Sequence, residues 1–372
     1  MPLILHLIDF TNRNKWIENQ IPLFIKNGIN QGVLSISSTR GEIHEVLEVS
    51  GLKKLGYFRP GIKGLHHVVS IIKKWSADED ICIYTHGHIP SIYGALIKLF
   101  TGTTFVICHH QQPNYLPNLL KRKFFRARVH LLLEHFYYLQ AQKIQSFSLE
   151  VDNYLRDKNV PSSKVIRIPL GINLENFSRI TPYPVTELGG KIHIVSIGRL
   201  VWEKRIDQGI ACVVKLIEAG FSIDYTIIGI GPELETLKQH VEKSGMSEFI
   251  HFLGYRNNID EILNRADLLL HMSFTESYGQ ILMEARFAGT PIFSSACGVA
   301  LDMDALQDPG IYVFRGTEID QITRELSVFI QNLNSRKAEI EQISPSREYY
   351  NHEFDYAIYE VIKMFNSEFY KE

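Results

Sequence analysis

A glycine and two cations follow the end of a predicted strand in the second half of the chain. The strand predicted at 192–197 ends before Gly198, and Arg199 and Lys204 precede the next predicted helix. Glycine allows a ligand to approach the backbone closely, and the planar guanidinium of arginine can bind two phosphate oxygens at once. We therefore interpret this segment as a candidate diphosphate site that needs no metal. A solvated turn is the alternative interpretation, because arginine and lysine are common on surfaces.

A second strand-to-helix turn contains Gly229 and Gly231 in the sequence I-G-I-G-P-E. Backbone N–H groups at the start of a helix attract anions such as phosphate. The turn lacks the full G-x-G-x-x-G pattern of dinucleotide-binding proteins and the acidic residue that follows that pattern. It therefore indicates nucleotide binding only in combination with other segments.

The segment S-F-T-E-S-Y-G-Q-I-L-M-E places Glu276 in a turn and Glu284 on the helix that follows. At the predicted helix start, Tyr278, Gly279 and Gln280 would expose backbone N–H groups. The spacing of the two glutamates means little, because Glu is a common residue. Carboxylates, however, accept hydrogen bonds from the paired hydroxyls of ribose or hexose. We interpret the segment as a site that binds sugar hydroxyls with its carboxylates and phosphate with its amides.

The order and spacing of these segments resemble glycosyltransferase family 4, whose members are retaining enzymes of the GT-B fold. In chain order the segments read G-R-L-V-W-E-K, I-G-I-G-P, A-D-L-L-L-H-M-S and E-S-Y-G-Q-I-L-M-E-A-R-F-A-G-T-P-I. The first half is similar more loosely. His110, after a predicted strand at 104–108, resembles the family's post-strand histidine, and I-R-I-P-L-G-I-N at 166–173 resembles its interdomain linker.

The resemblance implies a role for each matching residue. Arg199 and Lys204 would bind the donor diphosphate and stabilise the leaving nucleotide, and Glu276 would contact the donor sugar. Glu284 would accept the ribose hydroxyls, and His110 would contribute from the acceptor side. The remaining donor-binding candidates are Gly198, Gly229, Gly231, Tyr255, Arg256, Ser277, Tyr278, Gly279, Gln280 and Ile281.

The implied reaction is transfer of a hexose-type sugar, with retention, from a nucleotide sugar to a glycan or glycolipid in cell-surface polysaccharide biosynthesis. A UDP-sugar is favoured over GDP-mannose, and neither a cofactor nor a metal is expected. The sequence shows no evident carboxylate nucleophile, and same-face attack guided by the leaving phosphate would need none. A nucleotide-sugar epimerase of similar architecture and a non-catalytic donor-binding partner subunit remain alternatives.

The sequence departs from the family pattern at several positions. The loop 9–15 contains no glycine where the family often has a glycine-rich loop, and we hypothesise that Arg13 or Lys15 contacts the diphosphate there. The other departures are Leu170 in place of the usual Asn, Arg205 in place of the usual Gly, and Gly298 without its usual second Gly. These changes concern donor identity and contacts of the first domain more than the overall activity.

The elements that must position these residues are short apolar strands alternating with amphipathic helices. The predicted strands are 3–8, 31–37, 81–84, 104–108, 192–197, 222–228, 250–253, 268–272 and 291–294, and the predicted helices are 16–26, 207–219, 233–243, 259–265 and 280–288. Such alternation predicts βαβ units and parallel sheets, which bind ligands at the carboxyl ends of their strands. We expect an α/β protein of two doubly wound, Rossmann-like domains facing a central cleft.

We divide the chain into an acceptor-side domain (1–170), a nucleotide-sugar-binding domain (171–350) and a C-terminal helix (351–372) that packs back on the first domain. The boundary falls in a segment rich in proline and glycine, and the C-terminal segment carries aromatic residues at helical spacing. The chain has 372 residues, which is too long for one ordinary core.

Composition excludes several classes of protein. The hydrophobic content of 45% and charged content of 22% are typical of a soluble globular protein, and a net charge of −2 argues against general nucleic-acid binding. The sequence shows no signal-peptide pattern and no apolar run long enough to span a membrane, so we expect a cytoplasmic protein. Leu119–Tyr138 combines five cations with apolar residues, which predicts either peripheral membrane contact or an ordinary surface helix.

The cysteines and paired histidines suggest metal chemistry only superficially. Cys82, Cys108, Cys212 and Cys297 are widely scattered, so we expect four small buried hydrophobic residues and no disulfide. The pairs His86/His88 and His109/His110 are accompanied by no evident Cys or carboxylate ligand, whereas zinc uses three or four ligands. We therefore expect no metal site.

Overall fold

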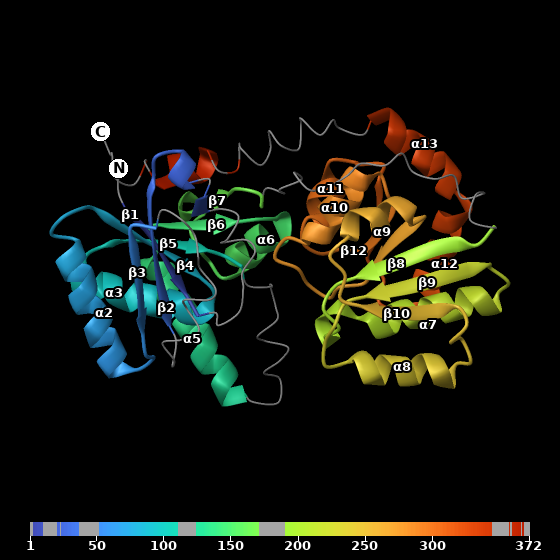
Figure 1. The fold of residues 1–372 in the computed structure, drawn as a ribbon, viewed down its shortest axis with the longest axis horizontal. Helices are drawn as coiled ribbons and strands as arrows, with labels where there is room; N and C mark the ends of the chain where they lie inside the picture. Colours follow the sequence, from blue (N-terminus) through green and yellow to red (C-terminus); the bar gives the residue numbers. More distant parts are fainter. Residues whose placement is uncertain are drawn as a thin grey trace. The chain divides into compact units, whose positions relative to one another are not determined.

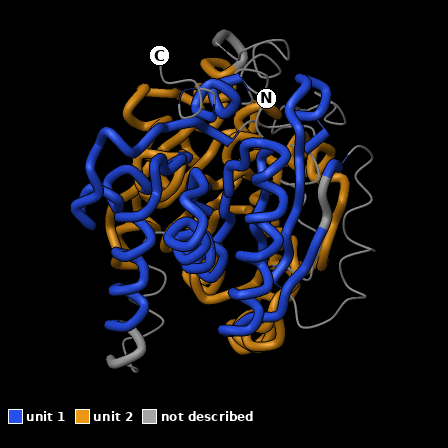
Figure 2. The backbone as a smooth tube through the Cα atoms, turned by 90° about the vertical axis from the view of Figure 1, so that its left-hand side faces the viewer, with its two compact units in different colours: residues 1–147, 151–171, 354–372 blue, residues 148–150, 172–353 orange. Residues whose placement is uncertain are grey.

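The computed structural model describes residues 3–9, 21–22, 24–36, 52–110, 124–170, 190–343, 357, 359–365 and 367. The chain divides into two compact units, coloured separately in Figure 2. Unit 1 comprises residues 1–147, 151–171 and 354–372, and unit 2 comprises residues 148–150 and 172–353. Each unit is built around its own parallel sheet.

Unit 1 contains a seven-stranded sheet in the order β3-β2-β1-β4-β5-β6-β7 among the residues described (Figure 1). Its strands are β1 (Leu3–Ile8), β2 (Asn30–Ile36), β3 (Lys54–Phe58), β4 (Ile81–His86), β5 (Thr104–Cys108), β6 (Lys143–Ser146) and β7 (Val165–Arg167). Its helices are α2 (Ile62–Trp75), α3 (His88–Thr101), α5 (Phe124–Gln140), α6 (Leu149–Asp157) and the 3-10 turn η1 (Ser162–Lys164). The first residues of α6 group with unit 2.

The core of unit 1 follows from strands that are buried on both faces. All six residues of β1 are buried, as a continuous apolar run in a parallel sheet requires. Helix α3 packs so closely on the sheet at Gly94 that a Cβ atom there would lie 2.6 Å from the ring of Phe105. From the C-terminal segment, the ring of Phe365 meets that of Tyr84 edge-on at 5.1 Å.

Unit 2 contains a six-stranded sheet in the order β10-β9-β8-β11-β12-β13 within the described part of the chain (Figure 1). Its strands are β8 (Ile192–Ile197), β9 (Ile223–Ile228), β10 (Ile250–Gly254), β11 (Leu268–His271), β12 (Ile292–Ser295) and β13 (Ile311–Phe314). Its helices are α7 (Ile206–Glu218), α8 (Leu234–Lys243), α9 (Ile259–Arg265), α10 (Gln280–Ala288), α11 (Ala300–Ala305), α12 (Ile319–Gln331), α13 (Leu333–Ile343) and the 3-10 turn η3 (Trp202–Lys204).

A buried ion pair ties the last described helix of unit 2 to the sheet. Lys337 Nζ on α13 lies 2.6 Å from Asp267 Oδ1, with side chains 10% and 2% exposed. The other oxygen of Asp267 accepts a hydrogen bond from the backbone N–H of His193 at 2.8 Å. Because both groups are removed from water, loss of either one would leave an uncompensated buried charge.

Both sheets reverse their strand order beside their first strand. In unit 1 the chain runs outward from β1 to β3 and returns to β4 on the other side of β1, and β8 to β11 repeat this arrangement in unit 2. All the strand pairs are parallel. Sheets of this kind typically bind ligands at the carboxyl ends of the strands beside such a reversal, which here means beside β1 and beside β8.

The predicted doubly wound α/β architecture is confirmed. The strands at 104–108 and 192–197 and the helices at 259–265 and 280–288 have the predicted bounds. All four cysteines are buried, and none forms a disulfide within the described ranges. Among the described helices, none combines the length and apolar character needed to cross a membrane.

Some predictions fall outside the described residues. These are the contacts of Arg13 and Lys15, most of the helix at 16–26, the linker residues beyond 170, the start of the basic segment at 119–123, and the aromatic residues Tyr349, Tyr350 and Phe354.

Candidate functional site

Three predicted segments of unit 2 meet at the carboxyl ends of adjacent strands. Gly198 follows β8, Gly229 follows β9, and Glu276 lies in the turn after β11. Because β8 pairs with both β9 and β11, these turns lie at the strand-order reversal.

The glycines of the I-G-I-G-P turn are required by packing of two backbones. Gly229 has φ 142°, and a Cβ atom there would overlap the carbonyl group of Gly198. A Cβ atom on Gly231 would overlap the carbonyl group of Leu200. The turn after β9 therefore lies directly against the turn after β8, which brings its backbone close to the predicted cations.

Lys204 and Glu276 form a buried ion pair at the centre of this region. The ammonium of Lys204 donates a hydrogen bond to Glu276 Oε1, and the side chains are 16% and 8% exposed. The lysine side chain passes beside Gly198, where a Cβ atom would lie 3.8 Å from Cε of Lys204. Burial by itself raises the pKa of Glu276, but the charge of Lys204, together with His271, outweighs burial and lowers this pKa to about 2.

Two residues that the sequence analysis did not select hold the same carboxylate oxygen. His271 Nε2 lies 3.2 Å from Glu276 Oε1, and the hydroxyl of Ser273 donates to that oxygen at 3.0 Å. His271 Nδ1 lies 3.1 Å from Ser294 Oγ on the neighbouring strand. Both residues lie in the segment A-D-L-L-L-H-M-S. Two polar residues at the end of a buried strand are the sequence feature that could have identified them as site residues.

Glu150 is a half-buried carboxylate that sequence reasoning missed. It accepts hydrogen bonds from the Thr275 hydroxyl at 2.7 Å, the Gly298 N–H at 2.6 Å and the Glu276 N–H at 3.3 Å. Burial is the main reason that its pKa is raised. Gly298 has φ 53°, and a Cβ atom there would overlap the carbonyl of Tyr278. Glu150 thus connects the turn containing Glu276 to the segment after β12.

Helix α10 begins beside this turn with its amides available as an anion site. Gly279 is its N-cap at φ 89°, and no side-chain cap is found among the described residues. Tyr278 is buried, and the Ser277 carbonyl accepts a hydrogen bond from Ser148 at 2.9 Å. Glu284, one turn inside the helix, accepts a hydrogen bond from the Gln280 side chain at 2.9 Å. Ile281 is half-buried in the same first turn.

Other predicted residues of unit 2 lie at the surface. The Arg199 side chain is 72% exposed, and Arg199 Nη2 lies 4.0 Å from Glu203 Oε1. Tyr255 and Arg256 follow β10 and are exposed, and the Arg256 guanidinium donates to the Tyr255 carbonyl at 3.0 Å. Arg205, at the usual glycine position, has φ 47°, which explains why glycine suits that position.

His110 lies in unit 1 and contacts other histidine and cysteine side chains. His86 Nδ1 is 3.0 Å from His110 Nε2, and Cys108 Sγ is 3.1 Å from the same nitrogen. Burial lowers the pKa of His110 to about 3. The expectation that the paired histidines have no cysteine beside them is therefore wrong. Parallel pairing places His86 at the end of β4 opposite Cys108 at the end of β5, a register that the sequence does not reveal.

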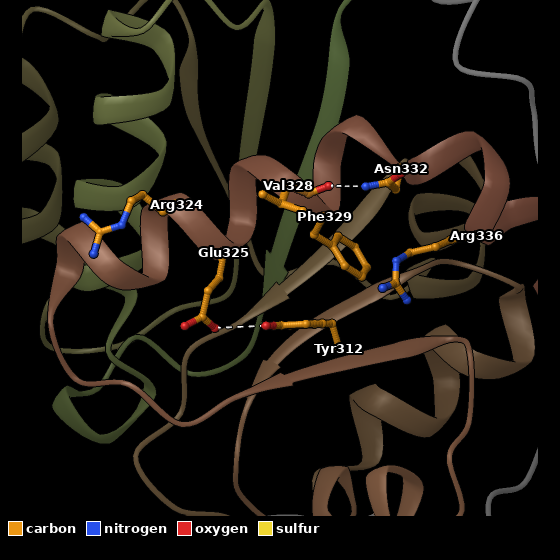
Figure 3. A pocket seen from close by; sticks show the side chains of 7 residues that line it. All are labelled: Tyr312, Arg324, Glu325, Val328, Phe329, Asn332 and Arg336. Atoms are coloured by element: carbon orange, nitrogen blue, oxygen red, sulfur yellow. Dashed lines mark hydrogen bonds between the residues drawn. The ribbon is translucent and has the colours of Figure 1, made fainter.

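A separate pocket of about 270 Å³ lies between β13 and helices α12 and α13 (Figure 3). Its lining residues are Tyr312, Arg324, Glu325, Val328, Phe329, Asn332 and Arg336. None of the predicted site residues lines it. Two of the lining side chains contact each other, because the Arg336 guanidinium lies 4.5 Å from the centre of the Phe329 ring.

The geometry around Lys204 suits an anionic ligand with hydroxyl groups. An ammonium has three donors, and Glu276 accepts from one of them, so others remain for phosphate oxygens. The start of α10 adds partial positive charge, and fixed positive groups stabilise a departing anion. Such a site at the strand-order reversal of a doubly wound sheet is typical of α/β proteins that bind phosphate-containing ligands.

Comparisons with known proteins identify the group within this class. Residues 184–344 match the family model described as glycosyl transferases group 1. The lipopolysaccharide glucosyltransferase WaaG of Escherichia coli K12 is 43% identical over 60 residues, which are 16% of each chain. N-acetyl-alpha-D-glucosaminyl L-malate synthase of Bacillus anthracis is 31% identical over 107 residues, 29% of this chain and 27% of that protein. The chain thus aligns with less than a third of the length of either relative.

Structural similarity covers nearly the whole chain, whereas sequence similarity covers only part of it. The structure of HepE from Anabaena in complex with UDP superposes with a TM-score of 0.76 over 98% of this chain and 99% of that one, at 16% identity. Residues 184–344 therefore match the group 1 glycosyltransferase family model, and the chain as a whole has the GT-B fold of these solved structures. Both findings agree with the predicted resemblance to GT-B glycosyltransferases, and assignment to family 4 stays a prediction.

Proposed function

We propose that the chain is a retaining glycosyltransferase that moves a hexose-type sugar from a nucleotide sugar to a glycan or glycolipid acceptor. The observation that carries the proposal is the buried Lys204–Glu276 pair at the strand-order reversal of unit 2. It places a cation for the diphosphate beside a carboxylate for the sugar hydroxyls. The matched group 1 domain contains both residues.

The donor in this proposal is a UDP-sugar. Structures of HepE contain UDP and UDP-glucose, and their folds match that of this chain. We assign the ribose hydroxyls to Glu284 and the edge of the base pocket to Tyr255 and Arg256, which follow the neighbouring strand β10. Cell-surface polysaccharide biosynthesis is the proposed setting, supported by the name of the WaaG relative.

The chemistry follows from the charges that develop as the sugar–phosphate bond breaks. The sugar ring becomes positive and the departing diphosphate becomes more negative, so Lys204, Arg199 and the first amides of α10 stabilise the leaving group. Glu276 remains ionised near neutral pH, because its pKa is about 2, and accepts hydrogen bonds from the sugar. It is already held by three partners, which suits a fixed binding group better than a nucleophile. Retention then requires attack from the face that the diphosphate leaves, and no metal takes part.

We assign the acceptor to unit 1, with His110 as its contact. A glycolipid acceptor would bring the chain to the inner face of a membrane, through the basic segment 119–138. Flotation with anionic liposomes tests that contact, and absence of binding at low salt would remove it from the proposal.

Calorimetric titration with UDP, GDP, ADP and their sugar conjugates, with and without EDTA, tests the donor site. Saturable binding of one nucleotide that EDTA does not change and that Lys204→Ala abolishes is the expected result. Lys215→Ala is the matched control, because Lys215 forms an exposed pair with Asp320 on the same unit. Equal binding by wild type and Lys204→Ala would contradict the assigned site. If the chain binds none of these nucleotides, the alternative of a non-catalytic partner subunit would be favoured.

Activity is then measured with the donor that binds. Retaining transfer predicts that the anomeric configuration of the donor is preserved in the product, which proton NMR of the glycosidic linkage reports. Release of an altered nucleotide sugar without any acceptor would instead identify an epimerase.

A further inference from the structure

Three side chains that commonly bind transition metals meet at the carboxyl edge of the unit 1 sheet. His86 is the last residue of β4, Cys108 is the last residue of β5, and His110 follows two positions later. His86 Nδ1 lies 3.0 Å from His110 Nε2, and Cys108 Sγ lies 3.1 Å from that nitrogen. The three candidate ligand atoms all lie within 4.8 Å of one another.

A buried chain of hydrogen bonds determines which nitrogen of His86 carries its proton. Gln31 Oε1 can only accept, and it lies 2.6 Å from His6 Nε2, which must therefore carry the proton of that ring. His6 Nδ1 then accepts from His86 Nε2 at 3.0 Å. As a result, His86 Nδ1 presents its lone pair towards His110 and Cys108.

Metal binding would rearrange the protons of the cluster. Because His86 Nδ1 accepts, His110 Nε2 donates to it in the metal-free cluster, and its proton would move to His110 Nδ1 when an ion binds. The ion would also replace the thiol proton of Cys108, which is released to solvent, and the thiolate would compensate part of the charge of the ion.

We propose that His86 Nδ1, Cys108 Sγ and His110 Nε2 bind one divalent transition-metal ion, with zinc as the best match. Imidazole nitrogens with a thiolate sulfur are zinc ligands, whereas magnesium and calcium prefer oxygen. Bond lengths of about 2.0–2.3 Å put two ligand atoms of a tetrahedral zinc roughly 3.3–3.6 Å apart. The His86–His110 and Cys108–His110 separations of 3.0 and 3.1 Å need to open by about half an ångström to reach this range, and His86 Nδ1 and Cys108 Sγ, which lie within 4.8 Å of each other, need to reach the same range.

The hydrogen bonds behind the ligands resemble those that orient metal-binding histidines. A histidine that binds a metal through one nitrogen usually donates its other N–H to a fixed acceptor, which sets the ring orientation. His6 is that acceptor for His86, and Gln31 holds His6 in turn. Gln31, His6, His86 and Cys108 have a relative exposure of 0%, so water does not compete for these hydrogen bonds.

The proposed metal ligands and the proposed donor residues belong to different units. The metal ligands all lie in unit 1, whereas the donor residues all lie in unit 2. One consequence rests on the proposed function: an ion that occupies His110 Nε2 prevents this nitrogen from contacting an acceptor. Zinc is therefore expected to inhibit transfer reversibly.

Cobalt(II) binding to the full chain tests the site directly. Wild type is expected to bind one equivalent of cobalt with the thiolate-to-metal charge-transfer band of sulfur ligation, and zinc should displace it. Cys108→Ser should lose the band. Cys82→Ser, which changes another buried cysteine of the same sheet, should keep it. Absence of stoichiometric binding, or an unchanged band in Cys108→Ser, would overturn the proposal.

Gln31→Met provides a second test that retains all three ligands. It removes the acceptor that sets the proton positions, so zinc affinity measured against a competing chelator should fall by about 10- to 100-fold. The charge-transfer band should persist, and circular dichroism verifies folding. Unchanged affinity would overturn the assigned role of the hydrogen-bond chain. Zinc inhibition of transfer, reversed by EDTA, is measured separately, so a chain that binds zinc but transfers no sugar would contradict only the proposed function.

Discussion

Replacement of Lys204 by methionine would remove a buried charge while keeping a side chain of similar length. Glu276 would then lose its hydrogen-bonded ammonium, although His271 and Ser273 would still contact its carboxylate. The carboxylate is 8% exposed, so water cannot readily replace the lost partner. We expect unit 2 to be less stable and donor binding to be lost.

The size of the loss follows from the pKa of Glu276. Its shift from 4.5 to about 2 corresponds to stabilisation on the order of 3 kcal/mol at neutral pH. Without Lys204 the burial of the carboxylate is no longer compensated, so the expected cost is at least that large. Removal of one partner of a buried pair typically costs about 3–5 kcal/mol. For a unit of this size the melting temperature should fall by roughly 6 to 20 °C.

The dependence on pH distinguishes a lost charge interaction from lost packing. In wild type the folded pKa of Glu276 is depressed, so its stabilisation is fully present above about 4.5 and is lost as the pH falls towards about 2. In Lys204→Met the unpaired carboxyl has a raised pKa, and its protonation on acidification relieves the penalty. The stability difference between the two proteins should therefore be largest at neutral pH and should shrink towards about pH 4.

Urea unfolding at several pH values, followed by circular dichroism and calorimetry, measures this difference. Lys204→Arg is the charge-preserving control, and Lys204→Met combined with Glu276→Gln should recover much of the loss. A stability difference that is the same at neutral pH and at about pH 4 would refute the electrostatic explanation. So would a double variant as unstable as Lys204→Met alone, because the neutral amide removes the unpaired charge.

Three further predictions use matched pairs or analogues. Gly229→Ala should cost about 2–4 kcal/mol in urea unfolding, because its Cβ overlaps a carbonyl, whereas Gly220→Ala, also at positive φ but with open space, should cost less; equal costs would refute the overlap. Lys337→Met should destabilise unit 2 by about 3–5 kcal/mol, whereas Lys215→Met, which breaks an exposed pair, should cost far less; similar losses would show that burial is not decisive. Glu284→Ala should weaken UDP binding roughly tenfold to a hundredfold in calorimetry and remove any preference over 2′-deoxy-UDP; a retained preference would move the ribose contact elsewhere.

The elements of the fold were predictable because each one is encoded locally. A buried parallel strand needs a short run of apolar residues, and 104–108 and 192–197 show such runs with the observed bounds. The helix at 280–288 is bounded by glycines that both adopt positive φ. The order of the strands in each sheet could not be predicted from the sequence. It depends on which strands pair, and parallel pairing leaves no local pattern in the sequence.

The candidate site was predictable in its residue types but not in its contacts. Lys204 and Glu276 were each selected from their own segment, yet their ion pair joins positions 72 residues apart. Glu150 was missed because its partners lie 125 or more residues away in sequence. Its local context is an ordinary glutamate near the start of a helix, which carries no sign of burial.

The sequence by itself determined the alternation of strands and helices, the group 1 segments and the positions of the glycines at the strand ends. These depend on periodicity and on backbone conformation, which neighbouring residues control. Only the tertiary structure decided that Glu276 is held by His271 and Ser273 and that His110 contacts both His86 and Cys108. Strand order and register make those contacts, and the free energy that selects them comes from burial of whole sheets, which no short segment contains.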